Sequence, residues 1–132
     1  NLLHEKVEYE IMRNDIQTKE DIAQLVNVFY DRVLQNEKLA HFFAHLNFEE
    51  HKPKMVHFWS FVLLDEPGYN TNVFDKHANL HANSSDFNEW VSLFHSTVNE
   101  LFEGEKAEAA KFRATTLGYT FGSKLDALNN QA

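Results

Sequence analysis

The sequence predicts an all-α fold in a single domain. Helix-breaking residues are scarce, with four glycines and two prolines among 132 residues. No stretch alternates apolar and polar residues as a half-buried strand does, whereas apolar residues recur at intervals of three and four along four stretches. The length is typical of one domain. We assign residues 15–132 to that domain and residues 1–14 to an N-terminal extension whose order the pattern leaves undefined.

The first two predicted helices lie in the N-terminal half. The first begins at Thr18, because Asp21 follows three residues later in the pattern of a capping box. Its apolar stripe consists of Ile22, Leu25, Val26, Phe29 and Val33. The stripe of the second helix consists of Met55, Phe58, Trp59, Val62 and Leu63. We expect the sequence Glu66, Pro67 and Gly68 to end this second helix.

The third and fourth predicted helices lie in the C-terminal half. The third stripe consists of Phe87, Trp90, Val91, Phe94, Val98 and Leu101. Ser84 and Ser85 precede it as candidate N-caps, and Gly104 stands where a left-handed residue would terminate the helix. The fourth stripe consists of Ala110, Ala114, Leu117, Phe121, Leu125 and Leu128. Between Pro67 and Ser84 the helical period is absent, which predicts a loop or one short helical turn.

Composition and charge exclude several functions. The formal net charge is −8, and the twelve Lys and Arg residues are scattered, so the basic patch that nucleic-acid binding requires is missing. Without cysteine there is no disulfide, no thiolate ligand and no thioether-linked cofactor. The longest apolar run, residues 58–64, is far shorter than the ~20 residues of a membrane-spanning helix. The N-terminus lacks the pattern of a signal peptide, so we expect a cytoplasmic protein that does not bind membranes.

Three polar side chains are predicted to point into apolar faces. His51 shares a helical face with Met55 and Phe58, and an unpaired buried donor there would cost about 1–3 kcal/mol. His51 is therefore either a core histidine bonded to a backbone carbonyl or a pocket histidine that faces a ligand. Tyr30 and Trp90 also lie within apolar faces, where such residues more often belong to the core or reach the surface than contact a ligand.

His77 differs from these residues because it lies outside every stripe. His77 and His81 are four residues apart and could chelate a metal on a helix, but no further ligands at suitable spacing complete a zinc site. Twelve Phe, four Tyr and two Trp suit a flat conjugated ligand as well as a packed core. The sequence motifs of hydrolases, phosphate-binding loops and zinc proteases are absent.

Five segments, in this order, resemble the truncated haemoglobins of the third group. They are residues 21–30, 39–43, 50–59, 69 together with 77–80, and 86–94. Residues 21–30 are similar to the second helix of that family, in which a tyrosine follows an aromatic residue. The resemblance covers residues 15–128, nearly the whole chain.

The resemblance implies a globin-like fold, the truncated two-over-two helical sandwich, that holds non-covalent haem b. His77 would be the proximal iron ligand, because neutral imidazole is a good ligand of iron. Tyr30 and Trp90 would donate hydrogen bonds to a bound gas, and His51 would join this network or gate the pocket. The other haem-pocket residues that the resemblance implies are Phe43, Met55, Phe58, Tyr69, Leu80 and Phe94. From their positions alone, Lys54, Lys76 and His81 are candidates to bind the haem propionates.

The function implied by the resemblance is the binding of dioxygen, carbon monoxide and nitric oxide. Nitric-oxide or peroxide detoxification would need a separate reductase as electron donor, and whether the protein is an enzyme stays open at this point. Two alternatives also stay open. One is a haem-based gas sensor or redox protein, and the other is a helical bundle without haem in which His77 and His81 hold another metal or none.

Overall fold

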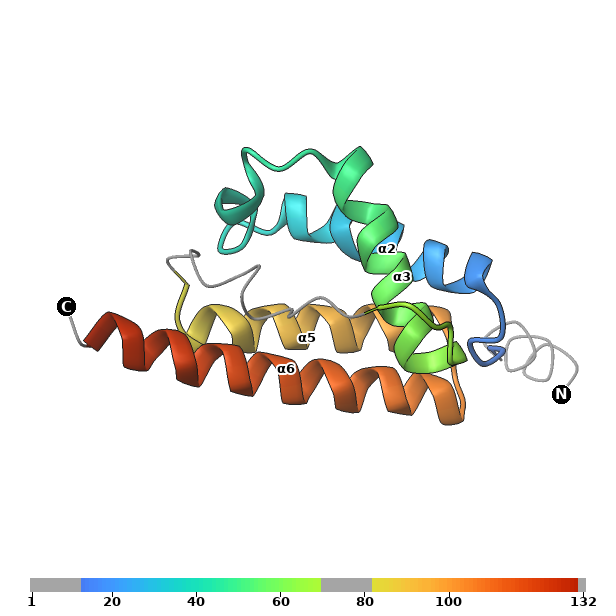
Figure 1. Ribbon diagram of the computed structural model, residues 1–132. Helices are drawn as coiled ribbons and strands as arrows, with labels where there is room; N and C mark the ends of the chain where they lie inside the picture. The colour runs from blue at the N-terminus through green and yellow to red at the C-terminus, as the bar shows by residue number, and fades with distance from the viewer. Residues whose placement is uncertain (1–12, 70–81, 131–132) are drawn as a thin grey trace, which may run out of the picture.

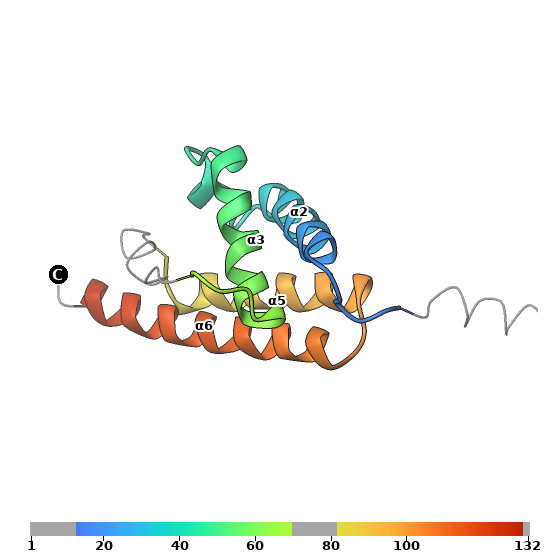
Figure 2. The same ribbon diagram turned by 45° about the vertical axis from the view of Figure 1, so that its right-hand side comes forward.

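The computed structural model describes residues 13–69 and 82–130. In this part of the chain the elements are α2 (Lys19–Gln35), the 3-10 helix η1 (Ala40–Phe43), α3 (Phe48–Leu64), α5 (Ser84–Leu101) and α6 (Glu105–Asn130), without any strand. Helices α5 and α6 run side by side, and α2 and α3 lie together over one face of this pair (Figures 1 and 2). Helix α2 packs on α5 and α3 packs on α6, so two helices cover two. The all-α prediction is confirmed.

The local signals at two helix ends act as predicted. The Thr18 hydroxyl accepts a hydrogen bond from the Asp21 backbone N–H, and the Asp21 carboxylate accepts one from the Thr18 N–H, which completes the capping box of α2. Helix α3 ends at Leu64, and Asp65 adopts a left-handed conformation with φ 57° just before Pro67. The polar and helix-breaking residues after the second stripe therefore end it where the sequence indicated.

The predicted cap of α5 is wrong. The N-cap is Asn83, not Ser84 or Ser85. The Asn83 side chain accepts from the Asp86 N–H, and the Asp86 carboxylate accepts from the Asn83 N–H, so an acidic residue three positions on decides the cap. Ser84 instead bonds Asp126 of α6 through its hydroxyl at 2.7 Å.

The predicted roles of Gly104 and Leu128 are also wrong. Helix α5 already ends at Leu101 with Phe102 in extended conformation, and Gly104 lies in the turn that enters α6. Its φ is +145°, and a Cβ there would lie 2.5 Å from the Asp15 Cγ, so glycine makes room for that side chain. Leu128 is 49% exposed because α6 runs past the start of α5 (Figure 1).

Asp15 ties the start of the described chain to α6. Its carboxylate oxygens accept hydrogen bonds from the backbone N–H groups of Lys106 and Ala107, both at 2.9 Å. These N–H groups belong to the first turn of α6 and have no partner within the helix. Asp15 therefore acts as a cap for α6 although it lies about ninety residues away in the sequence.

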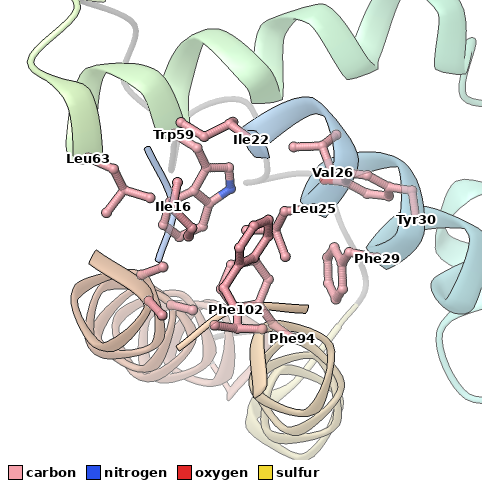
Figure 3. Close-up of a cluster of buried hydrophobic side chains, with 14 of the residues drawn as sticks. Ile16, Ile22, Leu25, Val26, Phe29, Tyr30, Trp59, Leu63, Phe94 and Phe102 are labelled. Carbon is pink, nitrogen blue, oxygen red and sulfur yellow. The ribbon is translucent and has the colours of Figure 1, made fainter. Parts of the chain in front are cut away.

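The main core lies between the two layers (Figure 3). Ile16, Ile22 and Leu25 are almost completely buried. Trp59 of α3 stacks on Phe94 of α5 with ring centroids 4.9 Å apart, which joins the upper and lower layers. Within residues 13–69 and 82–130, none of the helices is both long and apolar enough to cross a membrane.

Candidate functional site

A large cavity lies beside this core. It encloses about 690 Å³ of empty space, part of which opens to solvent. Its walls come from α2, η1, α3, α5 and α6 and consist of Val26, Phe29, Tyr30, Phe43, Met55, Phe58, Trp59, Phe87, Trp90, Phe94, Leu117 and Phe121. Walls made mainly of apolar and aromatic side chains are typical of small-molecule sites. Aromatic side chains form most of its wall.

Tyr30 brings a hydroxyl group to this apolar wall. Helix α2 carries the residue, and its ring packs edge-on against Phe43 at 5.9 Å between centroids. The hydroxyl oxygen lies 3.2 Å from His51 Nε2. Burial raises the pKa of the Tyr30 phenol above its ordinary value of 10.0. The hydroxyl therefore keeps its proton at neutral pH and remains a hydrogen-bond donor.

Trp90 lies in the part of the wall that α5 provides. Its ring meets Phe29 edge-on at 5.6 Å and stacks on Phe94 at 5.8 Å, so two neighbours fix its plane. Among the residues that the structure describes, no hydrogen-bond acceptor is found for its indole N–H. This N–H is a donor at the edge of an apolar cavity.

His51 reaches the site through Tyr30. It lies in the first half of α3, half-buried, and its ring contacts Tyr30 and Phe48 edge-on at 5.2 Å and 6.2 Å. Asn47 starts this helix, and its side chain accepts a hydrogen bond from the Glu49 N–H at 3.0 Å. The cap places His51 on the face of α3 that looks towards α2.

The candidate site residues from the sequence fall into three groups. Those that line the cavity are Tyr30, Phe43, Met55, Phe58, Trp90 and Phe94. Three others lie outside its wall: His51 contacts Tyr30, Tyr69 packs on Phe58 at 5.3 Å, and Lys54 is exposed. Lys76, His77, Leu80 and His81 lie outside the described residues.

Sequence reasoning did not single out half of the cavity wall. These residues are Val26, Phe29, Trp59, Phe87, Leu117 and Phe121. All six belong to or border apolar stripes, which shows that they face inward. The stripes carry no signal that distinguishes a side chain in a filled core from one that borders a cavity.

The described residues contain no separate metal-binding site. No group of three or more His, Asp or Glu side chains within residues 13–69 and 82–130 is arranged to hold a metal ion. The interpretation in which His77 and His81 hold a metal concerns residues outside the described part. The cavity is thus the candidate site that the described structure offers.

Comparisons with known proteins agree with the fold and the resemblance. The sequence profile of the bacterial-like globin family matches residues 14–117. The chain is 29% identical over 121 residues to the group 3 truncated haemoglobin of Campylobacter jejuni, covering 86% of this chain and 95% of that protein. The crystal structure of the group III truncated haemoglobin from Campylobacter jejuni aligns with a TM-score of 0.77 at 28% identity, over 86% of this chain and 95% of that one. The predicted resemblance and the globin fold are confirmed, and the chain belongs to the bacterial-like globin family as a haem-binding globin.

Proposed function

We propose that this globin holds haem b non-covalently in the cavity and binds dioxygen there, with the Tyr30 hydroxyl as the main hydrogen-bond donor to the gas. The observation that carries the proposal is the buried Tyr30 hydroxyl at the wall of an otherwise apolar cavity. A phenol in that position has little access to water, and its proton is retained because burial raises its pKa. Such a donor is suited to a small polar ligand inside the cavity.

The residues of the cavity fit haem. A flat conjugated ring needs wide apolar walls, and rings from four α-helices and from η1 supply them here. The chain contains no cysteine, which agrees with a non-covalent haem. When bound, haem supplies an iron centre that takes up diatomic gases and changes oxidation state. The resemblance supports His77 as the axial ligand, and this assignment is part of the proposal.

The donors of the cavity favour dioxygen over carbon monoxide. Dioxygen held at a haem site acquires partial negative charge, whereas carbon monoxide acquires less. The Tyr30 O–H and the Trp90 N–H would each donate to that charge in surroundings that exclude water, where hydrogen bonds are stronger than in solution. We therefore expect slow release of dioxygen.

His51 determines where the Tyr30 proton points. If His51 Nε2 carries a proton, it donates to the Tyr30 oxygen and leaves the phenolic hydrogen directed elsewhere. If Nε2 is unprotonated, it accepts that hydrogen and competes with the gas. We propose the first tautomer, in which His51 positions the Tyr30 hydroxyl to donate into the cavity. His51→Phe would then speed dioxygen release less than Tyr30→Phe does, because the donor itself remains.

The test is the rate of dioxygen dissociation from the haem-loaded protein. Tyr30→Phe removes the hydroxyl and keeps the ring, so we expect release about five- to thirtyfold faster, the equivalent of about 1–2 kcal/mol for one lost hydrogen bond. Trp90→Phe should also speed release. Carbon monoxide dissociation should change little in both variants.

Tyr119→Phe is the matched control, because it makes the same chemical change on an exposed tyrosine of α6. Its dioxygen release should equal that of the wild type. If Tyr30→Phe releases dioxygen at the wild-type rate, Tyr30 is not the donor and the proposed site is wrong. If the protein takes up no haem, with no Soret band after haem addition, the whole proposal fails.

A further inference from the structure

Helices α5 and α6 pack against each other at two glycines of α6. Gly118 and Gly122 are buried, and the two helices run side by side (Figures 1 and 2). Inside a helix, glycine is less favourable than every residue except proline. A Cβ added at Gly122 would lie 2.9 Å from the Ser84 Cα, and one at Gly118 would come still closer to Val91. Both glycines therefore serve the close approach of the two helices, not the stability of α6 itself.

Gly118 faces Val91 of α5. A Cβ added at Gly118 would lie 2.4 Å from Val91 Cγ2. Carbon atoms in contact are about 3.5–4.0 Å apart, so a methyl group there would push the two helices apart by roughly 1 Å. Valine has one strongly preferred rotamer in a helix, which means that its side chain does not turn away easily. The spacing of α5 and α6 at this point thus depends on the missing side chain of Gly118.

Hydrogen bonds on both sides of this contact hold α5 against α6. Near the start of α5, the Ser84 N–H and hydroxyl donate to the Asp126 carboxylate at 3.1 Å and 2.7 Å. Further along α5, His95 Nε2 lies 2.8 Å from the Thr115 hydroxyl oxygen. The displacement caused by a side chain at Gly118 should therefore be concentrated in the stretch of α5 between Ser84 and His95.

That stretch of α5 carries part of the cavity wall. Trp90 directly precedes Val91, and Leu117 directly precedes Gly118, and both Trp90 and Leu117 line the cavity. The depth at which Val91 packs on α6 therefore sets how far the Trp90 indole lies from the part of the wall on α6. Hydrogen bonds span about 2.7–3.2 Å between heavy atoms, so a displacement of roughly 1 Å is enough to lose one.

We propose that Gly118 is a positioning residue for Trp90. By leaving room for Val91 it fixes where the indole N–H lies relative to a ligand in the cavity. The inference rests on the proposed function, in which this N–H donates to dioxygen. Gly118 is not part of the cavity wall and acts only through α5. Carbon monoxide acquires less charge than dioxygen and should respond less to the position of the donor.

A pair of substitutions separates this effect from others. Gly118→Ala alone creates the close approach to Val91 Cγ2. When it is combined with Val91→Ala, that atom is gone, and the nearest neighbours of the added Cβ are the Phe87 carbonyl oxygen at 3.6 Å and the Cβ at position 91 at 3.8 Å. Both are ordinary contact distances. The double variant is therefore the matched control, because it keeps the added methyl group and removes the clash.

The first measurement is the ¹⁹F NMR spectrum of the full chain, without haem, labelled with 5-fluorotryptophan. The chain contains two tryptophans, so Trp90→Phe identifies the signal of Trp90 and leaves that of Trp59. Gly118→Ala should shift the Trp90 signal more than the Trp59 signal. In the Val91→Ala background the same substitution should leave the Trp90 signal unchanged.

Two results of this measurement would overturn the proposal. One is an unchanged Trp90 signal in Gly118→Ala. The other is an equal shift in the presence and absence of Val91→Ala, which would mean that the added methyl group acts by another route. Alanine favours the helix more than glycine does, so α6 itself is not weakened, and circular dichroism checks that the variants are folded.

The second measurement is dioxygen dissociation from the haem-loaded protein. Gly118→Ala should speed release by about two- to tenfold, as the loss of part or all of one hydrogen bond does, and should leave carbon monoxide release nearly unchanged. Combining it with Val91→Ala should restore the rate of Val91→Ala alone. In the Trp90→Phe background it should bring no further acceleration. Equal acceleration with and without the Trp90 indole would contradict the proposal.

The two measurements distinguish a failure of this inference from a failure of the proposed function. If Trp90→Phe leaves dioxygen release unchanged, the Trp90 N–H is not a donor, and the fluorine signals still decide whether Gly118 positions the indole. If Trp90→Phe speeds release but Gly118→Ala changes neither the Trp90 signal nor the rate, the donor role stands and Gly118 is not a positioning residue.

Discussion

The part of the core around Leu25 and the part around Tyr30 differ in how their space is filled. Leu25, Ile22 and Ile16 are almost completely buried and border no cavity. Tyr30 lies five residues further along α2, where side chains of five elements line a cavity that is partly open to solvent. Trp59 and Phe94 stack at the boundary and belong to both parts.

The polar groups of the two parts also differ in their ionisation. Beside the filled part, the Asp15 carboxylate binds backbone N–H groups of α6 and stays ionised. At the cavity, the Tyr30 phenol has a side-chain partner and stays neutral, because burial raises its pKa. We infer that one part of the core stabilises the fold, whereas the other keeps room and a proton for a ligand.

The largest expected difference concerns two leucines that receive the same substitution. Leu25→Ala should lower the free energy of unfolding of the haem-free protein by about 2–5 kcal/mol, because it opens a void in a filled region. Leu117→Ala should cost about half of that or less, since Leu117 already borders empty space and makes fewer contacts. Urea unfolding of both variants measures the two losses.

For haem retention we expect the opposite order, with the larger loss in Leu117→Ala. Leu117→Ala removes part of the wall of the cavity in which we propose that haem binds, so haem should pass faster to an acceptor such as apomyoglobin. Leu25→Ala should have the smaller effect on that rate, because Leu25 lies outside the wall. If Leu25→Ala and Leu117→Ala lost the same stability and released haem at the same rate, the two parts of the core would not differ as described.

The distinction between the two parts could not be predicted from the sequence. Local signals were readable, as the capping box of Thr18 and Asp21 shows, because both residues lie within one turn. Apolar stripes correctly indicated which side chains of α2 face inward. Asp15, however, binds Lys106 and Ala107, and Tyr30 binds His51 across 21 positions, so each pair depends on how the helices assemble.

The cap of α5 shows a second kind of limit. Asn83, Ser84 and Ser85 are all residue types that can cap a helix, but only Asn83 is followed three positions later by an acidic residue that completes a capping box. Ser84 and Ser85 were predicted as the caps, but Asn is as favourable as Ser at an N-cap, and the reciprocal bond with Asp86 selects Asn83. The cavity itself left no signal, because a residue that faces a ligand and a residue that faces another side chain share the same period.

A smaller loss of stability is expected when Asp15, which lies beside the filled part of the core, is substituted. Burial raises the pKa of this carboxyl, but hydrogen bonds from the N–H groups of Lys106, Ala107 and Ile16 and the charge of Lys106 outweigh it, so the pKa is lowered from 3.8. A lowered pKa gives stability that is present above pH 3.8 and lost as the pH falls through the folded-state value. Asp15→Asn should cost about 0.5–2 kcal/mol at neutral pH, as the loss of a helix cap does.

The measurement is the free energy of unfolding against pH for both proteins. The difference between the wild type and Asp15→Asn should shrink as the pH falls below 3.8. Asp31→Asn is the control, because the exposed Asp31 has only a long contact of 3.9 Å with Lys52. If the free energy of unfolding of the wild type fell with pH in the same way as that of Asp15→Asn, the Asp15 carboxylate would not stabilise the start of α6.

The smallest expected effect is an absence of change at the cavity. The raised pKa of Tyr30 means that its phenol keeps its proton beyond pH 10.0, where an ordinary tyrosine is half ionised. The ratio of dioxygen release rates between Tyr30→Phe and the wild type should therefore stay constant from neutral pH to pH 10. Above that pH the unfolded chain ionises first, so stability is lost as the pH rises, and the comparison is confined to the range below it. A ratio that falls towards one with a midpoint near pH 10 would mean that water reaches the hydroxyl, and the cavity would then not be the protected site that its aromatic wall suggests.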